Sequence, residues 1–106
     1  MSSYQNKEDV KMAESLVSIQ IIPKTANGED SIPFVDEAIK IIKESGVRYE
    51  VHPLETTMEG DLAMLLGIIE KMNHRMHELD CPSVISQVKI YSRKDNKASA
   101  HELTKK

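Results

Sequence analysis

The chain has 106 residues, a net charge of −3 and 40% hydrophobic residues, which together predict one globular domain with a small core. The negative charge argues against a nucleic-acid partner, because such a surface needs clustered positive charge to displace counterions. The only cysteine, Cys81, excludes an intrachain disulfide and favours a cytoplasmic location, and no apolar run approaches the roughly 20 residues that span a membrane.

Residues 1–13 are polar and aperiodic, which predicts a flexible N-terminal tail before a single domain over residues 14–106. The domain opens with a β-rich run over residues 16–22, which ends at Pro23. Side chains in this run alternate with the period of a strand. An apolar face therefore opposes a face with two polar residues: Val17, Ile19 and Ile21 against Ser18 and Gln20.

A helix is expected to begin after Ser31, a favourable N-cap, and to end at the stop signal Ser45-Gly46. Apolar side chains recur along it at helical spacing: Val35, Ala38, Ile39 and Ile42. A second strand is expected over residues 47–52, and a short third strand over residues 55–58.

A second helix is expected over residues 61–79. Its apolar stripe consists of Leu62, Leu65, Leu66, Ile69, Met72 and Met76. A fourth strand is expected over residues 84–92, and residues 98–105 are expected to form a short exposed helix. Alternation in the fourth strand places two sets of residues on opposite faces: Val84, Ser86, Val88 and Ile90 against Ile85, Gln87, Lys89 and Tyr91.

The order of these elements predicts an α+β, ferredoxin-like βαββαβ sandwich, in which two helices cover one face of an antiparallel four-stranded sheet. The other face of the sheet has no cover in this arrangement. It would carry a mixture of polar and apolar residues: Ser18, Gln20, Ile22, Ile85, Gln87 and Tyr91. Because such a face is rarely left bare, we expect it to meet another subunit in a homodimer or homotetramer.

The segment from His52 to Asp61 is the best candidate for a ligand site. Thr56 and Glu59 have the spacing of a capping box, in which both serve only to cap the second helix. The same helix start could bind a ligand, since Gly60 allows close approach and the Thr57 hydroxyl can donate or accept. Acidic residues crowd this position, which favours a cationic or uncharged ligand over a phosphate: Glu55, Glu59 and Asp61.

Ser18 and Gln20 form a second polar cluster on an otherwise apolar strand. They either face solvent or an interface, or they hydrogen-bond a flat heterocycle that stacks on Tyr49 or Tyr91. His52 is either a turn residue or a further ligand contact.

Metal-binding and catalytic patterns are weak in this sequence. His74 and His77 share a helix face, but no third metal ligand accompanies them, so no metal site and no cofactor is predicted. Cys81 has no neighbouring base that would make it a nucleophile. An enzyme would depend on three residues that crowd one loop: His52, Glu55 and Glu59.

Four segments in this order resemble the small YkoF-like, thiamine-binding family: SIQIIP at 18–23, VDEAI at 35–39, SGVRYEV at 45–51, and Pro53 with TTMEGD at 56–61. The likeness extends from about residue 14 to residue 95. It implies a ferredoxin-like subunit, dimers or tetramers that assemble through the sheets, and no catalysis. It also implies binding of thiamine (vitamin B1) or its hydroxymethylpyrimidine moiety in vitamin uptake or salvage.

The sequence therefore predicts a non-catalytic small-molecule binder without nucleic-acid or membrane partners. The alternatives are a structural or regulatory homo-oligomer with a protein partner, and a small ferredoxin-like enzyme. The expected ligand-binding residues are Ser18, Gln20, His52, Thr56, Thr57, Glu59 and Gly60.

Overall fold

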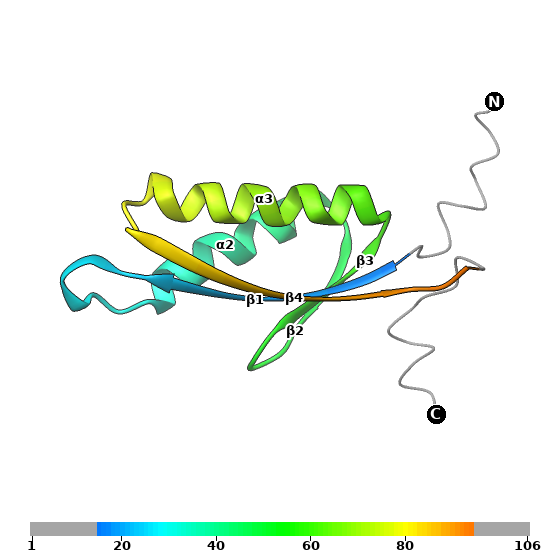
Figure 1. The fold of residues 1–106 in the computed structure, drawn as a ribbon, viewed down its shortest axis with the longest axis horizontal. Helices are drawn as coiled ribbons and strands as arrows, with labels where there is room; N and C mark the ends of the chain where they lie inside the picture. The colour runs from blue at the N-terminus through cyan, green and yellow to red at the C-terminus, as the bar shows by residue number, and fades with distance from the viewer. Residues whose placement is uncertain (1–14, 95–106) are drawn as a thin grey trace.

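The computed structural model describes residues 15–94. Two helices lie on one face of a four-stranded antiparallel sheet, which confirms the predicted ferredoxin-like fold (Figure 1). In chain order the elements are β1 (Ser15–Lys24), a short 3-10 helix (Ala26–Gly28), α2 (Ile32–Ser45), β2 (Arg48–Val51), β3 (Thr56–Gly60), α3 (Leu62–Glu78) and β4 (Ser83–Ser92).

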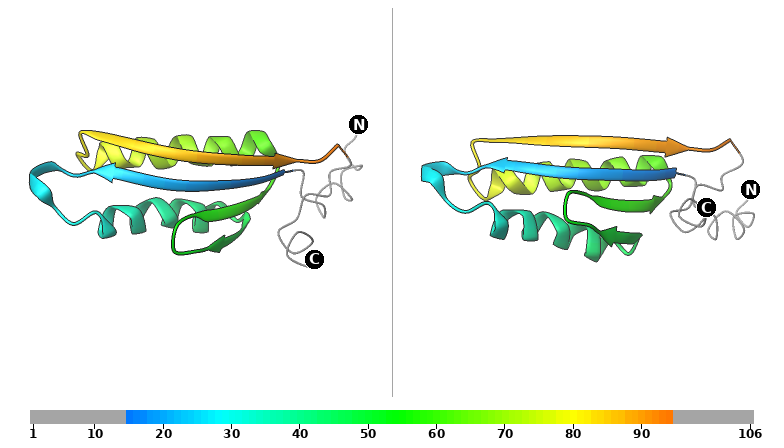
Figure 2. Two further views of the ribbon diagram at one scale, coloured as in Figure 1. Left: turned by 60° about the horizontal axis from the view of Figure 1, so that its bottom comes forward. Right: turned by 90° about the horizontal axis from the view of Figure 1, so that it is seen from below.

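The strand order is β2-β3-β1-β4, so β1 is central and β4 lies at one edge (Figure 2). Val17 of β1 lies opposite Met58 of β3 and Ile90 of β4, and all strand pairs are antiparallel. Pairing with β1 continues to Gly60, opposite Ser15, which extends β3 two residues beyond the expected end at Met58.

The core lies between the helices and the inner face of the sheet. Val17, Ile19 and Ile21 of β1 point into it, as the alternation predicted. The helices contribute Ala38 and Ile42 from α2, and Leu65, Ile68, Ile69, Met72 and Met76 from α3. The predicted stripe of α3 was wrong at Leu66, which is 41% exposed, because Ile68 takes the buried position instead.

The start of α3 differs from the predicted capping box. Thr56 lies in β3 rather than at the helix end, so it cannot cap α3. Asp61 is the N-cap, and its Oδ2 accepts a hydrogen bond from the backbone N–H of Met64 at 3.1 Å. Glu59 lies in β3, opposite Leu16 of β1 and Arg48 of β2.

The ends of α2 follow the prediction in position. Ser31 is at the N-cap, but its side chain makes no cap bond, and Asp30 accepts from the Ile32 N–H instead. Gly46 ends α2 with φ at 85°, a left-handed conformation that glycine adopts without the steric penalty of a Cβ.

The predicted tail over residues 1–13 and the predicted helix over residues 98–105 lie outside the described residues. Within residues 15–94, neither helix is long and apolar enough to cross a membrane.

Candidate functional site

The face of the sheet without helices, here called the open face, is the surface that the predicted site residues share. The right view of Figure 2 looks onto this face, with both helices behind the strands. Residues that alternate with the core positions occupy it, so its composition follows from strand period alone. From β1 these are Leu16, Ser18, Gln20 and Ile22, and from β4 they are Ile85, Gln87, Lys89 and Tyr91.

The centre of the open face is polar, and we call this group the polar strip. It consists of Ser18 and Gln20 on β1, Glu55, Thr57 and Glu59 on or beside β3, and Gln87 and Lys89 on β4. Apolar pairs flank it at both ends, Ile22 with Ile85 and Leu16 with Tyr91. A polar centre with apolar flanks is the composition expected of a small-molecule site.

Ser18 and Thr57 lie opposite each other, and their hydroxyl oxygens are 3.0 Å apart in a hydrogen bond. Only one of the two hydroxyls donates in this bond, so the pair keeps a further donor and lone pairs for a ligand. Both side chains are partly exposed. The pair therefore offers a preformed hydrogen-bonding group at the middle of the open face.

Charged residues of both signs surround this pair. Lys89 Nζ is 3.2 Å from a carboxylate oxygen of Glu55, and His52 Nε2 is 3.3 Å from Glu50. Arg48 lies opposite Glu59 in the β2–β3 pairing. The site is thus not uniformly acidic, and its cations could pair with a phosphate, which the sequence pattern did not predict.

The structure brings together four of the predicted ligand-binding residues, Ser18, Gln20, Thr57 and Glu59, on the open face. His52 follows β2, contacts Glu50, which lies opposite Thr57, and belongs to the β2–β3 hairpin, whose tip lies on the side of the sheet away from the helices (Figure 1).

Two predicted residues do not join this group. Thr56 is 5% exposed and faces the helices, because it alternates with Thr57. Gly60 lies at the end of β3, opposite Ser15, and its backbone packs near Leu65.

Glu55 and Lys89 belong to the polar strip, although the sequence analysis did not select them as ligand contacts. Strand alternation does predict that Lys89 shares a face with Gln87 and Tyr91. Alternation alone cannot predict the contact with Glu55. That contact depends on the strand order, in which β1 alone separates β4 from β3.

Tyr49 and Tyr91 lie on different faces of the sheet. Tyr49 packs against the core, as expected from its alternation with Arg48. Tyr91 is 41% exposed on the open face beside Leu16. Tyr91 is therefore the aromatic ring in position to stack on a flat ligand.

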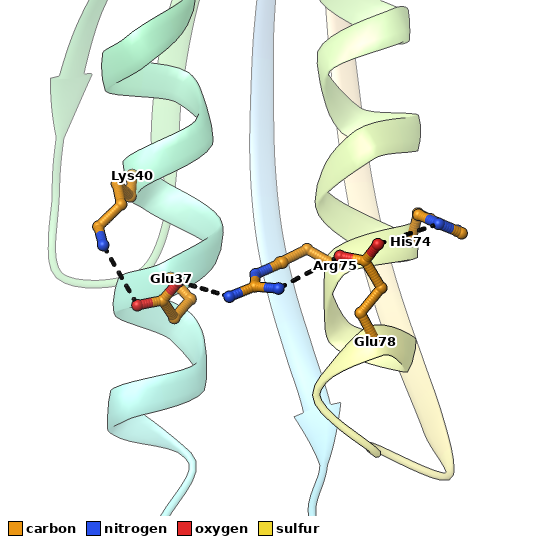
Figure 3. A network of polar contacts seen from close by, with 5 residues as sticks. All are labelled: Glu37, Lys40, His74, Arg75 and Glu78. Carbon is orange, nitrogen blue, oxygen red and sulfur yellow. Dashed lines mark hydrogen bonds and ion pairs between the residues drawn. The ribbon is translucent and has the colours of Figure 1, made fainter.

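The helix layer carries a groove of about 390 Å³. Its lining comes from both helices: Ile41, Glu70, Lys71, His74, Arg75 and Glu78. Figure 3 shows that three of its charged residues contact carboxylates or one another: Arg75 bonds to both Glu37 and Glu78, and His74 contacts Glu78.

These contacts shift the pKa values of Glu37 and Arg75 in opposite directions. The hydrogen bond from Arg75, with a second from Lys40, lowers the pKa of Glu37 below its ordinary value. Hydrogen bonds to Glu78 and then Glu37 raise the pKa of Arg75. We interpret this network as a structural link between α2 and α3, because Arg75 of α3 forms ion pairs with Glu37 of α2 and with Glu78.

Within residues 15–94, no three His, Cys, Asp or Glu side chains are grouped so as to hold a metal ion. His77 contacts the backbone carbonyl of Cys81 instead, with 3.2 Å between Nδ1 and that oxygen. Cys81 is buried, and desolvation raises the pKa of its thiol, which disfavours the nucleophilic thiolate.

Comparison with known proteins gives a match over most of the chain. The sequence profile of the family described as thiamine-binding protein matches residues 17–106. A UPF0045 protein of Clostridium perfringens is 44% identical over 80 residues, covering 74% of this chain and 81% of that protein.

Solved structures share the fold. A domain of unknown function, DUF77, from Bacillus cereus is 30% identical with a TM-score of 0.80, and the match covers 88% of each chain. A proposed thiamine biosynthesis or salvage protein of Thermotoga maritima is 24% identical with a TM-score of 0.74, covering 86% of this chain and 95% of that one.

Proposed function

Since the chain belongs to the thiamine-binding protein family, we propose that it is a non-catalytic protein that binds thiamine or its hydroxymethylpyrimidine moiety on the open face. Such a protein serves vitamin uptake or salvage as a carrier, buffer or sensor. The single observation that carries the placement is the polar strip, because it is a hydrogen-bonding centre with apolar flanks on a face that no helix covers.

The polar strip has the groups that an aminopyrimidine needs. The Ser18–Thr57 hydroxyls and the Gln20 amide supply donors and acceptors for ring nitrogens and the exocyclic amine. Glu59 can accept from that amine and offset the positive charge of the thiazolium ring. Tyr91 lies at the apolar end of the strip, where a flat ring can stack.

The test is isothermal titration of the purified chain with thiamine, hydroxymethylpyrimidine and thiamine phosphate. The proposal expects saturable binding of thiamine or the pyrimidine, with about one ligand per chain or per dimer and no conversion of the ligand. Absence of heat and of any thermal shift with all three compounds would contradict it.

We further propose that the chain is a homodimer or homotetramer whose subunits meet through the sheets. Four of the nine exposed large hydrophobic residues in the described part of the chain lie on β4, namely Ile85, Val88, Ile90 and Tyr91. An edge strand with exposed apolar residues favours self-association unless a partner covers it. A cytoplasmic location, suggested by the single cysteine, stays a prediction.

An enzymatic function is the main competitor. Its candidates, His52, Glu55 and Glu59, now lie around the open face rather than in a closed pocket. Turnover by the parent chain and by Glu59→Gln distinguishes the two hypotheses. An enzyme would lose turnover in Glu59→Gln, whereas a binding protein shows no turnover in the parent or in the variant.

A further inference from the structure

The Lys89–Glu55 ion pair crosses the middle of the open face. Lys89 lies on β4 and Glu55 directly precedes β3, and β1 separates these strands in the sheet. Neighbouring strands are about 4.8 Å apart. The 3.2 Å contact between Lys89 Nζ and Glu55 Oε1 therefore requires the lysine side chain to extend over β1.

The strand register shows where the pair crosses. Lys89 lies opposite Ser18, and Glu55 lies one residue before Thr56, which is opposite Ile19. The pair therefore crosses β1 between Ser18 and Gln20. A ligand that hydrogen-bonds to both of these residues must use the space that the lysine side chain occupies.

We propose that the Lys89–Glu55 ion pair determines the charge selectivity of this site. The thiazolium of a cationic ligand replaces the Lys89 ammonium beside Glu55, and the displaced ammonium can hold the phosphate of a phosphorylated ligand. This inference rests on the proposed function, because it concerns thiamine-class ligands on the open face.

Exposure supports an exchange of this kind. The Lys89 side chain is 78% exposed, whereas the Glu55 side chain is 32% exposed. An exposed ion pair contributes little to stability, so the long lysine side chain can leave at low cost. The more enclosed carboxylate stays beside β3, where it can pair with either the lysine or the ligand.

The experiment measures dissociation constants for thiamine, thiamine phosphate and hydroxymethylpyrimidine in the parent chain and two variants. Lys89→Met removes the competing ammonium, so thiamine should bind about two- to fivefold more tightly, the range of an exposed ion pair, and thiamine phosphate more weakly. Glu55→Gln should weaken the binding of thiamine more than that of thiamine phosphate, because the freed Lys89 ammonium still holds the phosphate. Hydroxymethylpyrimidine carries neither charge, so the two variants should change its dissociation constant by less than that of thiamine.

Lys24→Met is the matched control, since Lys24 is an exposed lysine at the far end of β1. It changes the net charge equally and should leave the ratio of the thiamine and thiamine phosphate constants at the parent value. Circular dichroism confirms that each variant is folded, and Lys89→Gln replaces Lys89→Met if the latter is not.

The outcomes separate the two proposals. If the parent binds thiamine and the Lys89 and Glu55 variants keep its ratio, the selectivity inference is overturned and the proposed function stands. An equal shift with Lys24→Met also overturns the inference, because the effect would then come from net charge. If the parent binds none of the three compounds, the proposed function fails and the inference fails with it.

Discussion

Thr56 and Thr57 are consecutive in β3 and face opposite sides of the sheet, so the same substitution at each position gives a test variant and its control. Thr57→Val removes the hydroxyl that bonds to Ser18, and we expect ligand affinity to fall by about three- to tenfold, the worth of one hydrogen bond. Glu59→Ala should weaken binding further, because it removes a charged acceptor. Titration calorimetry measures both, and the oligomer should persist in each.

Thr56→Val is the control for these variants. Thr56 is buried beneath the helices, so this change should leave affinity unaltered once folding is verified. If Thr56→Val weakens binding as much as Thr57→Val, the ligand does not lie on the open face.

The Glu37–Arg75 bond predicts a pH dependence of stability. Arg75 and Lys40 lower the pKa of Glu37 in the folded chain below its ordinary value of 4.5. The folded state therefore gains stability above that value and loses it as the pH falls through the folded-state pKa. Urea unfolding at pH 7 and at roughly pH 3 should show a larger stability loss for Glu37→Gln, relative to the parent, at the higher pH.

Glu44→Gln controls for charge on the same helix, because Glu44 is exposed near the end of α2. It should not reproduce the pH-dependent gap. A gap between Glu37→Gln and the parent that is equal at both pH values would mean that the ion pair does not contribute.

At the level of secondary structure, α3 depends on a cap that the sequence analysis attributed to other residues. Asp61 accepts from the Met64 N–H at 3.1 Å, and Asp61→Ala should lower the free energy of unfolding by about 1 kcal/mol. Asp36→Ala, an exposed change inside α2, should be nearly neutral. Equal losses in chemical denaturation would show that the cap bond is not the cause.

The error over this cap shows what short-range sequence patterns can determine. Thr56 and Glu59 have capping-box spacing, but the same residues also alternate as a strand does, and local spacing cannot choose between the two. Pairing with β1 decides, because it places Thr56 opposite Ile19 and Glu59 opposite Leu16.

At the level of the whole molecule, β4 provides a test of the assembly. Ile85 and Ile90 are similarly exposed, at 46% and 50%, but they point to opposite faces of the sheet. If subunits meet through the open faces, Ile85→Asp should dissociate the oligomer to monomers, whereas Ile90→Asp should not. Light scattering after size-exclusion chromatography measures the mass of each variant.

Dissociation by both variants would point to the β4 edge as the contact instead, because an edge contact involves both faces of the strand. A parent chain that is already monomeric would contradict the proposed assembly. If the parent is an oligomer and Ile85→Asp is a monomer, ligand titration of that variant shows whether binding depends on the assembly.

The sequence by itself determined the order of the elements, the faces of β1 and β4, and most of the core. These features follow from periodicity, which is a local property of the chain. Ser18 and Gln20 could therefore be placed on the uncovered face, and Tyr49 in the core, before any pairing was known.

Only the tertiary structure decided which residues meet on that face. The Ser18–Thr57 bond and the Lys89–Glu55 ion pair join residues from separate strands, and their proximity depends on strand order and register. Register is set by hydrogen bonding and burial across the whole sheet, and a slip of one residue would turn each side chain to the opposite face. The fold could thus be read from local pattern, whereas the site required the assembled sheet.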